Sequence, residues 1–163
     1  MAENTAPDLG IRPAVAADRP RLIPLINSAF AIETFLEGSR TNDEQLAAMM
    51  AKGAILLAED ASGCLLGSVY TELRGACGYL GMLAVDPARQ GSGVARRLVA
   101  AAEDRFREQG CEAIEIVVLS LRPDLPPIYE RFGFVEIRRE EFTPVRSLRP
   151  GFECHGIVMS KKL

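Results

Sequence analysis

The sequence offers few residues for metal sites or nucleophilic triads. Its single histidine, His155, excludes a histidine-rich metal site and makes a serine or cysteine triad hard to build. The cysteines are scattered without any C-x-x-C pair, at Cys64, Cys77, Cys111 and Cys154. Because metal-binding cysteines are clustered, we interpret these four as reduced thiols. We therefore expect no metal site.

Long apolar segments are also absent. No stretch approaches the ~18 uninterrupted apolar residues of a membrane span, and residues 1–10 are too polar for a signal peptide. The net charge of −3 leaves no general basic surface for nucleic acid. We therefore expect a cytoplasmic protein that binds neither membrane nor nucleic acid. With 16 arginines against 3 lysines, contacts to anions would come mainly from guanidinium groups.

What the chain does have is the composition of a folded domain. Its 163 residues are 48% hydrophobic and 25% charged, which suits a chain that buries its own core. No internal repeat or linker divides it. We expect a mobile tail over residues 1–8 and a single domain over residues 9–163.

Apolar periodicity predicts the elements of the first half. A helix is predicted to begin at Asp18 and to be distorted or shortened by Pro24. A second helix starts at Thr41, three residues before Glu44 in capping-box spacing, and ends near Lys52. Strands are predicted at 9–14, 54–59, 65–73 and 79–85. The last three form an antiparallel meander, because their short turns leave no room for a crossover.

In the second half, a strand–helix–strand unit is predicted. Apolar residues repeat at helical spacing from Gly93 to Gly110, and the next strand, 113–119, becomes fully apolar. A buried strand after a helix indicates a parallel pair. A short helix at 127–132 and strands at 134–141 and 152–159 complete the chain. The fold class is α/β of the α+β kind, with a mixed, mostly antiparallel twisted sheet of about seven strands and about four helices.

The turn between strand 79–85 and the following helix has the chemistry of an anion site. Its residues Gly91, Ser92, Gly93 and Ala95 are small and leave backbone N–H groups uncovered at the start of a helix. A P-loop is excluded because no lysine follows the glycines, and Arg96 replaces the third glycine of a dinucleotide fingerprint. A serine-hydrolase elbow, G-x-S-x-G, is absent as well. A plain glycine-rich turn without a ligand is the alternative.

Two motifs resemble those of the GNAT superfamily of N-acetyltransferases. The segment Val85–Leu98 is similar to its coenzyme A motif [RQ]-x-x-G-x-[GA], with Gln90, Gly93 and Ala95 in the fixed positions. Further along the chain, Tyr129-x-x-x-Gly133-Phe134 resembles a second signature of the superfamily. The order of the elements fits as well, so the resemblance covers about residues 9–160.

The resemblance implies acetyl-CoA as cosubstrate and a sheet whose central parallel strands, 79–85 and 113–119, splay apart. The pantetheine arm would lie in that gap. The implied cofactor-binding residues are Leu83, Ala84, Val85, Gln90, Gly91, Ser92, Gly93, Val94, Ala95 and Arg96. Of these, the residues from Gly91 to Arg96 would offer their amides to the pyrophosphate, helped by Arg89, Arg96 or Arg97.

The resemblance also implies a catalytic acid, Tyr129, that donates a proton to the departing thiolate. Glu33 and Glu72 are the candidates for binding the acceptor ammonium or taking its proton, directly or through water. The chain departs from the pattern at two positions. Arg122 and Leu125 stand where many relatives carry asparagine and alanine, which puts a pantetheine contact and the pocket wall in question.

The predicted function is transfer of an acetyl group from acetyl-CoA to a primary amine by direct attack. A non-catalytic acyl-CoA-binding or regulatory module is the alternative, and a small nucleotide binder is a third hypothesis. The acceptor stays open between small molecules, peptides and protein lysines, and the acidic net charge mildly favours a cationic one. Dimers are common in the family, so a homodimer is compatible with the resemblance.

Overall fold

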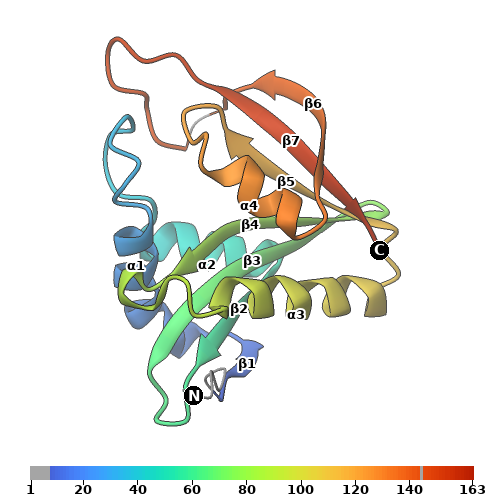
Figure 1. The fold of residues 1–163 in the computed structure, drawn as a ribbon. Coiled ribbons are helices and arrows are strands. Elements are labelled where there is room, and N and C mark those ends of the chain that lie inside the picture. Colours follow the sequence, from blue (N-terminus) through green and yellow to red (C-terminus); the bar gives the residue numbers. More distant parts are fainter. Residues whose placement is uncertain (1–7, 144) are drawn as a thin grey trace, which may run out of the picture.

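The fold is organised around one mixed sheet of seven strands in the order β1-β2-β3-β4-β5-β7-β6 (Figure 1). The computed structural model describes residues 8–143 and 145–163, so the predicted tail lies outside the described residues except for Asp8. The strands are β1 (Gly10–Pro13), β2 (Ala54–Glu59), β3 (Leu65–Arg74), β4 (Cys77–Val85), β5 (Ala113–Leu119), β6 (Val135–Glu141) and β7 (His155–Lys162). The helices are α1 (Arg19–Ala29), α2 (Asp43–Lys52), α3 (Val94–Glu108) and α4 (Leu125–Arg131). The predicted fold class is confirmed.

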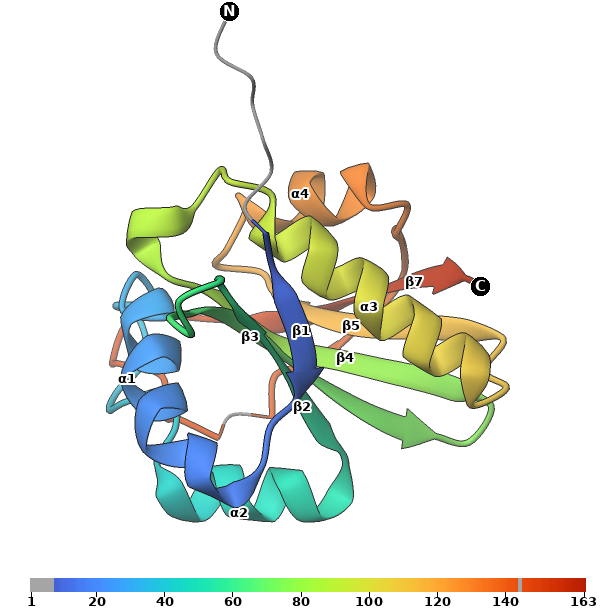
Figure 2. The ribbon, with the colours of Figure 1, turned by 90° about the horizontal axis from the view of Figure 1, so that it is seen from below.

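Both faces of the sheet are covered by helices. Figure 2 shows α1 and α2 on one side and α3 and α4 on the other. Successive side chains of a strand point to opposite faces, so Ile55 and Leu57 of β2 pack with α1 and α2, whereas Leu56 and Ala58 pack with α3. This double burial explains the unbroken apolar run of β2.

The start of α2 differs from the prediction. Its N-cap is Asn42, whose side-chain oxygen accepts a hydrogen bond from the amide of Gln45 at 2.9 Å. The predicted capping box at Thr41 is therefore wrong. Thr41 is buried, and its amide donates to the side-chain oxygen of Asn27 at 2.9 Å, which ties the start of α2 to α1. Thr41, which the local spacing predicts as the cap, is instead engaged in a tertiary contact with Asn27.

Helix α1 continues without interruption through Pro24 to Ala29, so the predicted shortening is wrong. Pro24 is exposed, whereas Leu22 and Ile26 are fully buried against the sheet. The backbone bond that proline removes therefore lies on the exposed side of the helix. Asp18 stands at the N-cap as predicted but makes no capping bond. Its carboxylate instead pairs with Arg12 and Arg21.

Strands β4 and β5 pair only at their beginning. Their parallel register joins Cys77–Tyr79 to Ala113–Glu115, after which β5 continues alongside β7 while β4 stays with β3. The implied splaying of the central pair is confirmed. Past the last pair, Met82 has a positive φ of 50° where the β3–β4 register shifts, as expected for a bulge. A bulge bends a strand, and here it lies on the wall of the gap.

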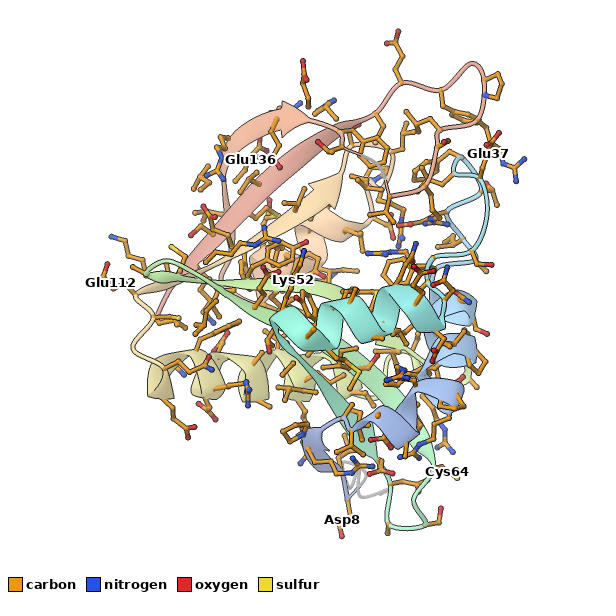
Figure 3. All side chains as sticks on the ribbon, turned by 180° about the vertical axis from the view of Figure 1, so that it is seen from behind. Asp8, Glu37, Lys52, Cys64, Glu112 and Glu136 are labelled. Atoms are coloured by element: carbon orange, nitrogen blue, oxygen red, sulfur yellow. The ribbon has the colours of Figure 1, made fainter. Side chains whose placement is uncertain are left out.

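Two loops far apart in sequence meet beside this gap. The loop after α1 and the loop before β7 are joined by a bridge between Leu36 and Leu148. The amide of Glu37 donates to the carbonyl of Ser147 at 2.8 Å. Figure 3 shows Glu37 on the loop after α1, beside the loop that leads into β7. These contacts fix one end of the gap with residues about a hundred positions apart in the chain.

Within the two described ranges, no helix is long and apolar enough to cross a membrane. The four cysteines are free thiols, as interpreted from their spacing. Among residues 8–143 and 145–163, no group of three or more histidine, cysteine or acidic side chains is arranged to hold a metal ion.

Candidate active site

A groove of about 1150 Å³ follows the gap between β4 and β5. One wall is β4 from Tyr79 to Val85, without Ala84, and the other is the end of β5. The N-terminal turn of α3 closes one end, and the loops after α1 and before β7 lie at the other. Because β4 and β5 no longer bond to each other here, their facing edges leave backbone groups for a ligand.

The turn into α3 presents open backbone to the groove. Gly91 and Gly93 have φ values of +82° and +85°, and a Cβ built at either position would meet nothing within 4 Å. Gly93 is the N-cap and makes no side-chain capping bond. The first amides of α3 therefore lack intrahelical partners and point their positive dipole end at the groove. The space and the donors fit a phosphate group.

Most residues implied by the coenzyme A motif line the groove. They are Leu83, Val85, Gln90, Gly91, Gly93, Val94, Ala95 and Arg96. Ala84 points instead into the core beneath α1, and the Ser92 hydroxyl donates to the carbonyl of Arg89. Of the three arginines considered for the outlying phosphates, Arg89 and Arg96 line the groove. The third, Arg97, donates to the carbonyl of Leu9 at 3.2 Å and lies outside the lining.

Tyr129 lines the groove from α4. Its ring packs edge-on against Phe132 and Phe134, with centroids 6.2 and 5.8 Å apart, so the aromatic body is held by the core. No described residue forms a hydrogen bond with its hydroxyl. Burial, with a smaller effect from Tyr79, raises the pKa of Tyr129 to about 12. The phenol is therefore protonated at neutral pH and available as a donor.

Glu33 is held between two guanidinium groups. Its Oε2 accepts from Arg122 at 2.9 Å and its Oε1 from Arg146 at 2.6 Å, while the carboxylate side chain is only 4% exposed. Arg122 also pairs with Asp124 at 2.9 Å, just before α4. The arginine that replaces the usual asparagine thus connects the loop after α1 to the start of the tyrosine-bearing helix. Glu33 lines the groove, but both of its oxygens already have cationic partners.

Glu72 does not line the groove. It lies on β3, where it accepts hydrogen bonds from the hydroxyl of Tyr70 at 3.1 Å and from Arg74 at 3.3 Å. The Arg74 guanidinium in turn stacks over the ring of Tyr79, 3.7 Å from its centroid, and both of these residues do line the groove. Glu72 therefore reaches the site through Arg74, and not directly.

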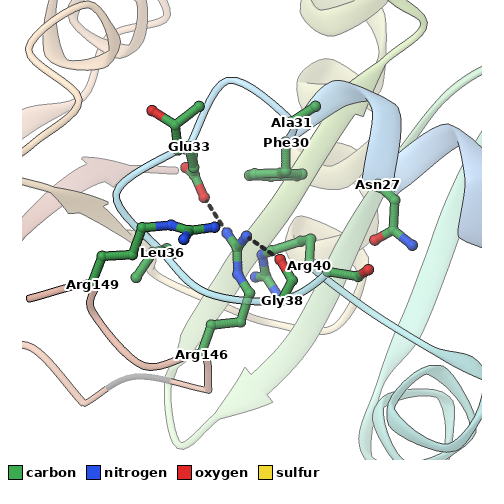
Figure 4. Close-up of a pocket in the computed structure, with 11 residues that line it drawn as sticks. Asn27, Phe30, Ala31, Glu33, Leu36, Gly38, Arg40, Arg146 and Arg149 are labelled. Carbon is green, nitrogen blue, oxygen red and sulfur yellow. Dashed lines mark hydrogen bonds and ion pairs between the residues drawn. The ribbon is translucent and has the colours of Figure 1, made fainter.

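A smaller pocket of about 280 Å³ adjoins the groove (Figure 4). The sequence reasoning named Glu33 of its lining but missed the arginines that gather there. Its charged lining residues are Glu33, Arg40, Arg146 and Arg149. The excess of arginine over lysine was the only feature of the sequence that pointed to a cluster of arginines. Nothing local in the sequence places Arg40 beside two arginines more than a hundred residues later.

Comparison with known proteins agrees with this geometry. The model of the acetyltransferase (GNAT) domain matches residues 25–144. Glucosamine 6-phosphate N-acetyltransferase 1 of Oryza sativa subsp. japonica is 32% identical over 136 residues, covering 77% of this chain and 81% of the relative. A mycothiol acetyltransferase of Propionibacterium freudenreichii is 36% identical over 107 residues, which cover 63% of this chain but only 34% of that longer protein.

Solved structures share the fold at low sequence identity. The ribosomal-protein-S18-alanine N-acetyltransferase from Escherichia coli has a TM-score of 0.72 at 18% identity, covering 94% of this chain and 93% of its own. The structure of yncA from Salmonella typhimurium, described with its cofactor acetyl-CoA, has a TM-score of 0.74 at 21% identity with the same coverage. The sequence matches and the shared fold, together with the open turn at Gly91 and Gly93, show that this chain belongs to the GNAT family of acetyltransferases.

Proposed function

We propose that this protein transfers an acetyl group from acetyl-CoA to a primary amine by direct attack. The observation that carries the proposal is the placement of Tyr129 on the same groove as the open amides of the α3 turn. A molecule that combines phosphates with a thioester arm could contact both. The alternative of a module that only binds acyl-CoA gives no role to a placed phenol.

The residues of the groove fit acetyl-CoA. The amides from Gly91 to Arg96 would hold the pyrophosphate, since no side chain covers the turn at either glycine. The free edge of β4 at Leu83 and Val85 would hold the pantetheine amides as an added strand does. Arg96, whose guanidinium lies 5.5 Å from the ring centroid of Phe132, and Arg89 would be the cations of this turn that could contact an outlying phosphate. When bound, acetyl-CoA supplies the thioester whose carbonyl carbon an amine can attack.

In this reaction the carbon–sulfur bond breaks as the new amide bond forms, and the departing sulfur needs a proton. Tyr129 would donate it, because burial keeps the hydroxyl protonated and no described residue competes for it. Its ring contacts with Phe132 and Phe134 limit the positions that the hydroxyl can reach. Proximity and orientation of this kind are what a placed acid contributes.

The acceptor ammonium must also lose a proton before it attacks. We propose that Glu33 acts by holding Arg122 and Arg146 in place, since each of its oxygens already accepts from a guanidinium. Glu72 is separated from the groove by Arg74. Loss of the proton to water in the open groove is the route that needs no further side chain.

Substitution of Tyr129 by phenylalanine tests the proposal. Removing one placed acid is expected to lower kcat by about 10²-fold or more while the KM for acetyl-CoA changes little. Tyr70→Phe is the matched control, because it removes a phenolic hydroxyl that bonds to Glu72 outside the groove. The assay is release of coenzyme A thiol across a panel of amines. Equal losses in the two variants would contradict the assignment of Tyr129, and thiol release at the wild-type rate by Tyr129→Phe would remove it from the mechanism.

A further inference from the structure

The smaller pocket carries an excess of positive charge. Three of its lining residues, Arg40, Arg146 and Arg149, are cationic, and one, Glu33, is anionic. Figure 4 shows the three arginine side chains pointing toward one another. Like charges that converge in this way repel each other unless a counter-charge lies between them.

Glu33 does not supply that counter-charge to the whole cluster. Its two oxygens contact Arg122 and Arg146, at 2.9 and 2.6 Å. Among residues 8–143 and 145–163, neither Arg40 nor Arg149 forms an ion pair within 4.0 Å. Arg40 is half-buried, and its guanidinium lies over the ring of Phe30 at 5.1 Å from the centroid. Burial lowers the pKa of Arg40, and the negative charge of Glu33 offsets this effect only in part.

We propose that Arg40, Arg146 and Arg149 bind an anionic group, a phosphate or a carboxylate, carried by the amine that accepts the acetyl group. The proposal rests on the proposed function, because it assumes that an amine reaches the groove. The planar, forked guanidinium matches the oxygens of both kinds of anion. The pocket volume of about 280 Å³ has room for such a group.

The position of the pocket is consistent with this role. It shares Phe30, Glu33, Leu36, Arg40 and Arg146 with the lining of the groove, so the two spaces adjoin. An acceptor anchored here by its anion would extend its amine into the groove that Tyr129 lines. The net charge of −3 by itself favours a cationic acceptor, but the local charge of the pocket has the opposite sign. Electrostatic recognition follows the local arrangement because distant charges are screened by salt.

The first test compares amines that differ only in the anion. The phosphate arm compares glucosamine 6-phosphate with glucosamine as acceptors. The carboxylate arm compares an α-amino acid with its α-amide. In the preferred arm, kcat/KM is expected to be about 10- to 100-fold higher for the anionic member, the size typical of charge-assisted hydrogen bonds. Arg40→Gln should remove most of this difference and leave the KM for acetyl-CoA unchanged. The control, Arg105→Gln, removes an equal charge from α3 outside both spaces and should preserve the difference.

A binding measurement makes the result independent of turnover. Inorganic phosphate is titrated by calorimetry into the wild type and into Arg40→Gln with coenzyme A present to fill the α3 turn. Tighter binding by the wild type supports the pocket. Arg40→Lys keeps the charge and should retain part of the binding, and melting temperatures without ligand show whether each variant is folded.

The outcomes separate the two proposals. If no amine is acetylated but phosphate binding still depends on Arg40, the proposed function fails and the anion pocket stands. If phosphate binds equally to the wild type and to folded Arg40→Gln, the anion pocket is overturned whether or not acetylation occurs. Equal kcat/KM for the anionic and neutral members of both arms would also overturn it.

Discussion

Replacing Glu33 by glutamine separates a structural role for this carboxylate from a catalytic one. The side chain is 4% exposed, and each oxygen pairs with an arginine that is itself largely buried, Arg122 at 13% and Arg146 at 9% exposure. Removing the charge leaves two guanidinium groups facing each other across a neutral amide. Removing one partner of a buried ion pair typically costs about 3–5 kcal/mol. Glutamine keeps one oxygen as an acceptor, so we expect a loss of about 3 kcal/mol in the free energy of unfolding.

For a chain of this length, a loss of that size lowers the melting temperature by roughly 6–12 °C, at ~2–4 °C for each kcal/mol. The assay is thermal and urea unfolding of the wild type, Glu33→Gln and Glu37→Gln. Glu37 lies on the same loop but is exposed, so its variant should stay within about 0.5 kcal/mol of the wild type. Unchanged stability of Glu33→Gln together with a flattened pH–rate profile would refute this reasoning and make Glu33 the general base.

Two further predictions concern the core and the acid stability of the fold. At Gly78 on β4, an added Cβ would lie 2.5 Å from the ring of Phe106, so Gly78→Ala should overpack the core and cost about 1–3 kcal/mol, measured by urea unfolding. Hydrogen bonds from Arg12, the largest cause, hold the pKa of Asp18 well below its usual range. The stabilisation is therefore present above the pKa of the unfolded state and is lost as the pH falls through the pKa of the folded state. We expect the wild type to exceed Asp18→Asn in unfolding free energy by about 1–3 kcal/mol at neutral pH. This difference should narrow steadily as the pH is lowered into the acid range. A gap that stays constant down to about pH 2 would contradict the assignment to this carboxylate.

Local sequence was sufficient for the bounds of several strands and for a candidate phosphate-binding turn, whereas the last strand, predicted at 152–159, is observed at His155–Lys162. The strands 54–59 and 113–119 are observed with their predicted bounds, because runs of β-branched and apolar residues bounded by turn residues encode a strand within a few positions. The glycines at 91 and 93 adopt positive φ, which small-residue turns before a helix favour. The residues that would hold phosphates are contiguous in the chain, so one motif indicates them together.

The contacts of the loop after α1 and the lining of the smaller pocket were decided by tertiary structure alone. Thr41 does not cap α2 as predicted, and its amide donates instead to Asn27 on another helix. Glu33 meets Arg146 only because the loops after α1 and before β7 lie side by side, 113 positions apart in sequence. The same meeting of loops places Arg40 against Arg149 in one pocket lining. Backbone preference and hydrophobic periodicity act over a few residues, whereas ion pairs and pocket charge depend on where distant loops are brought by the packing of the sheet.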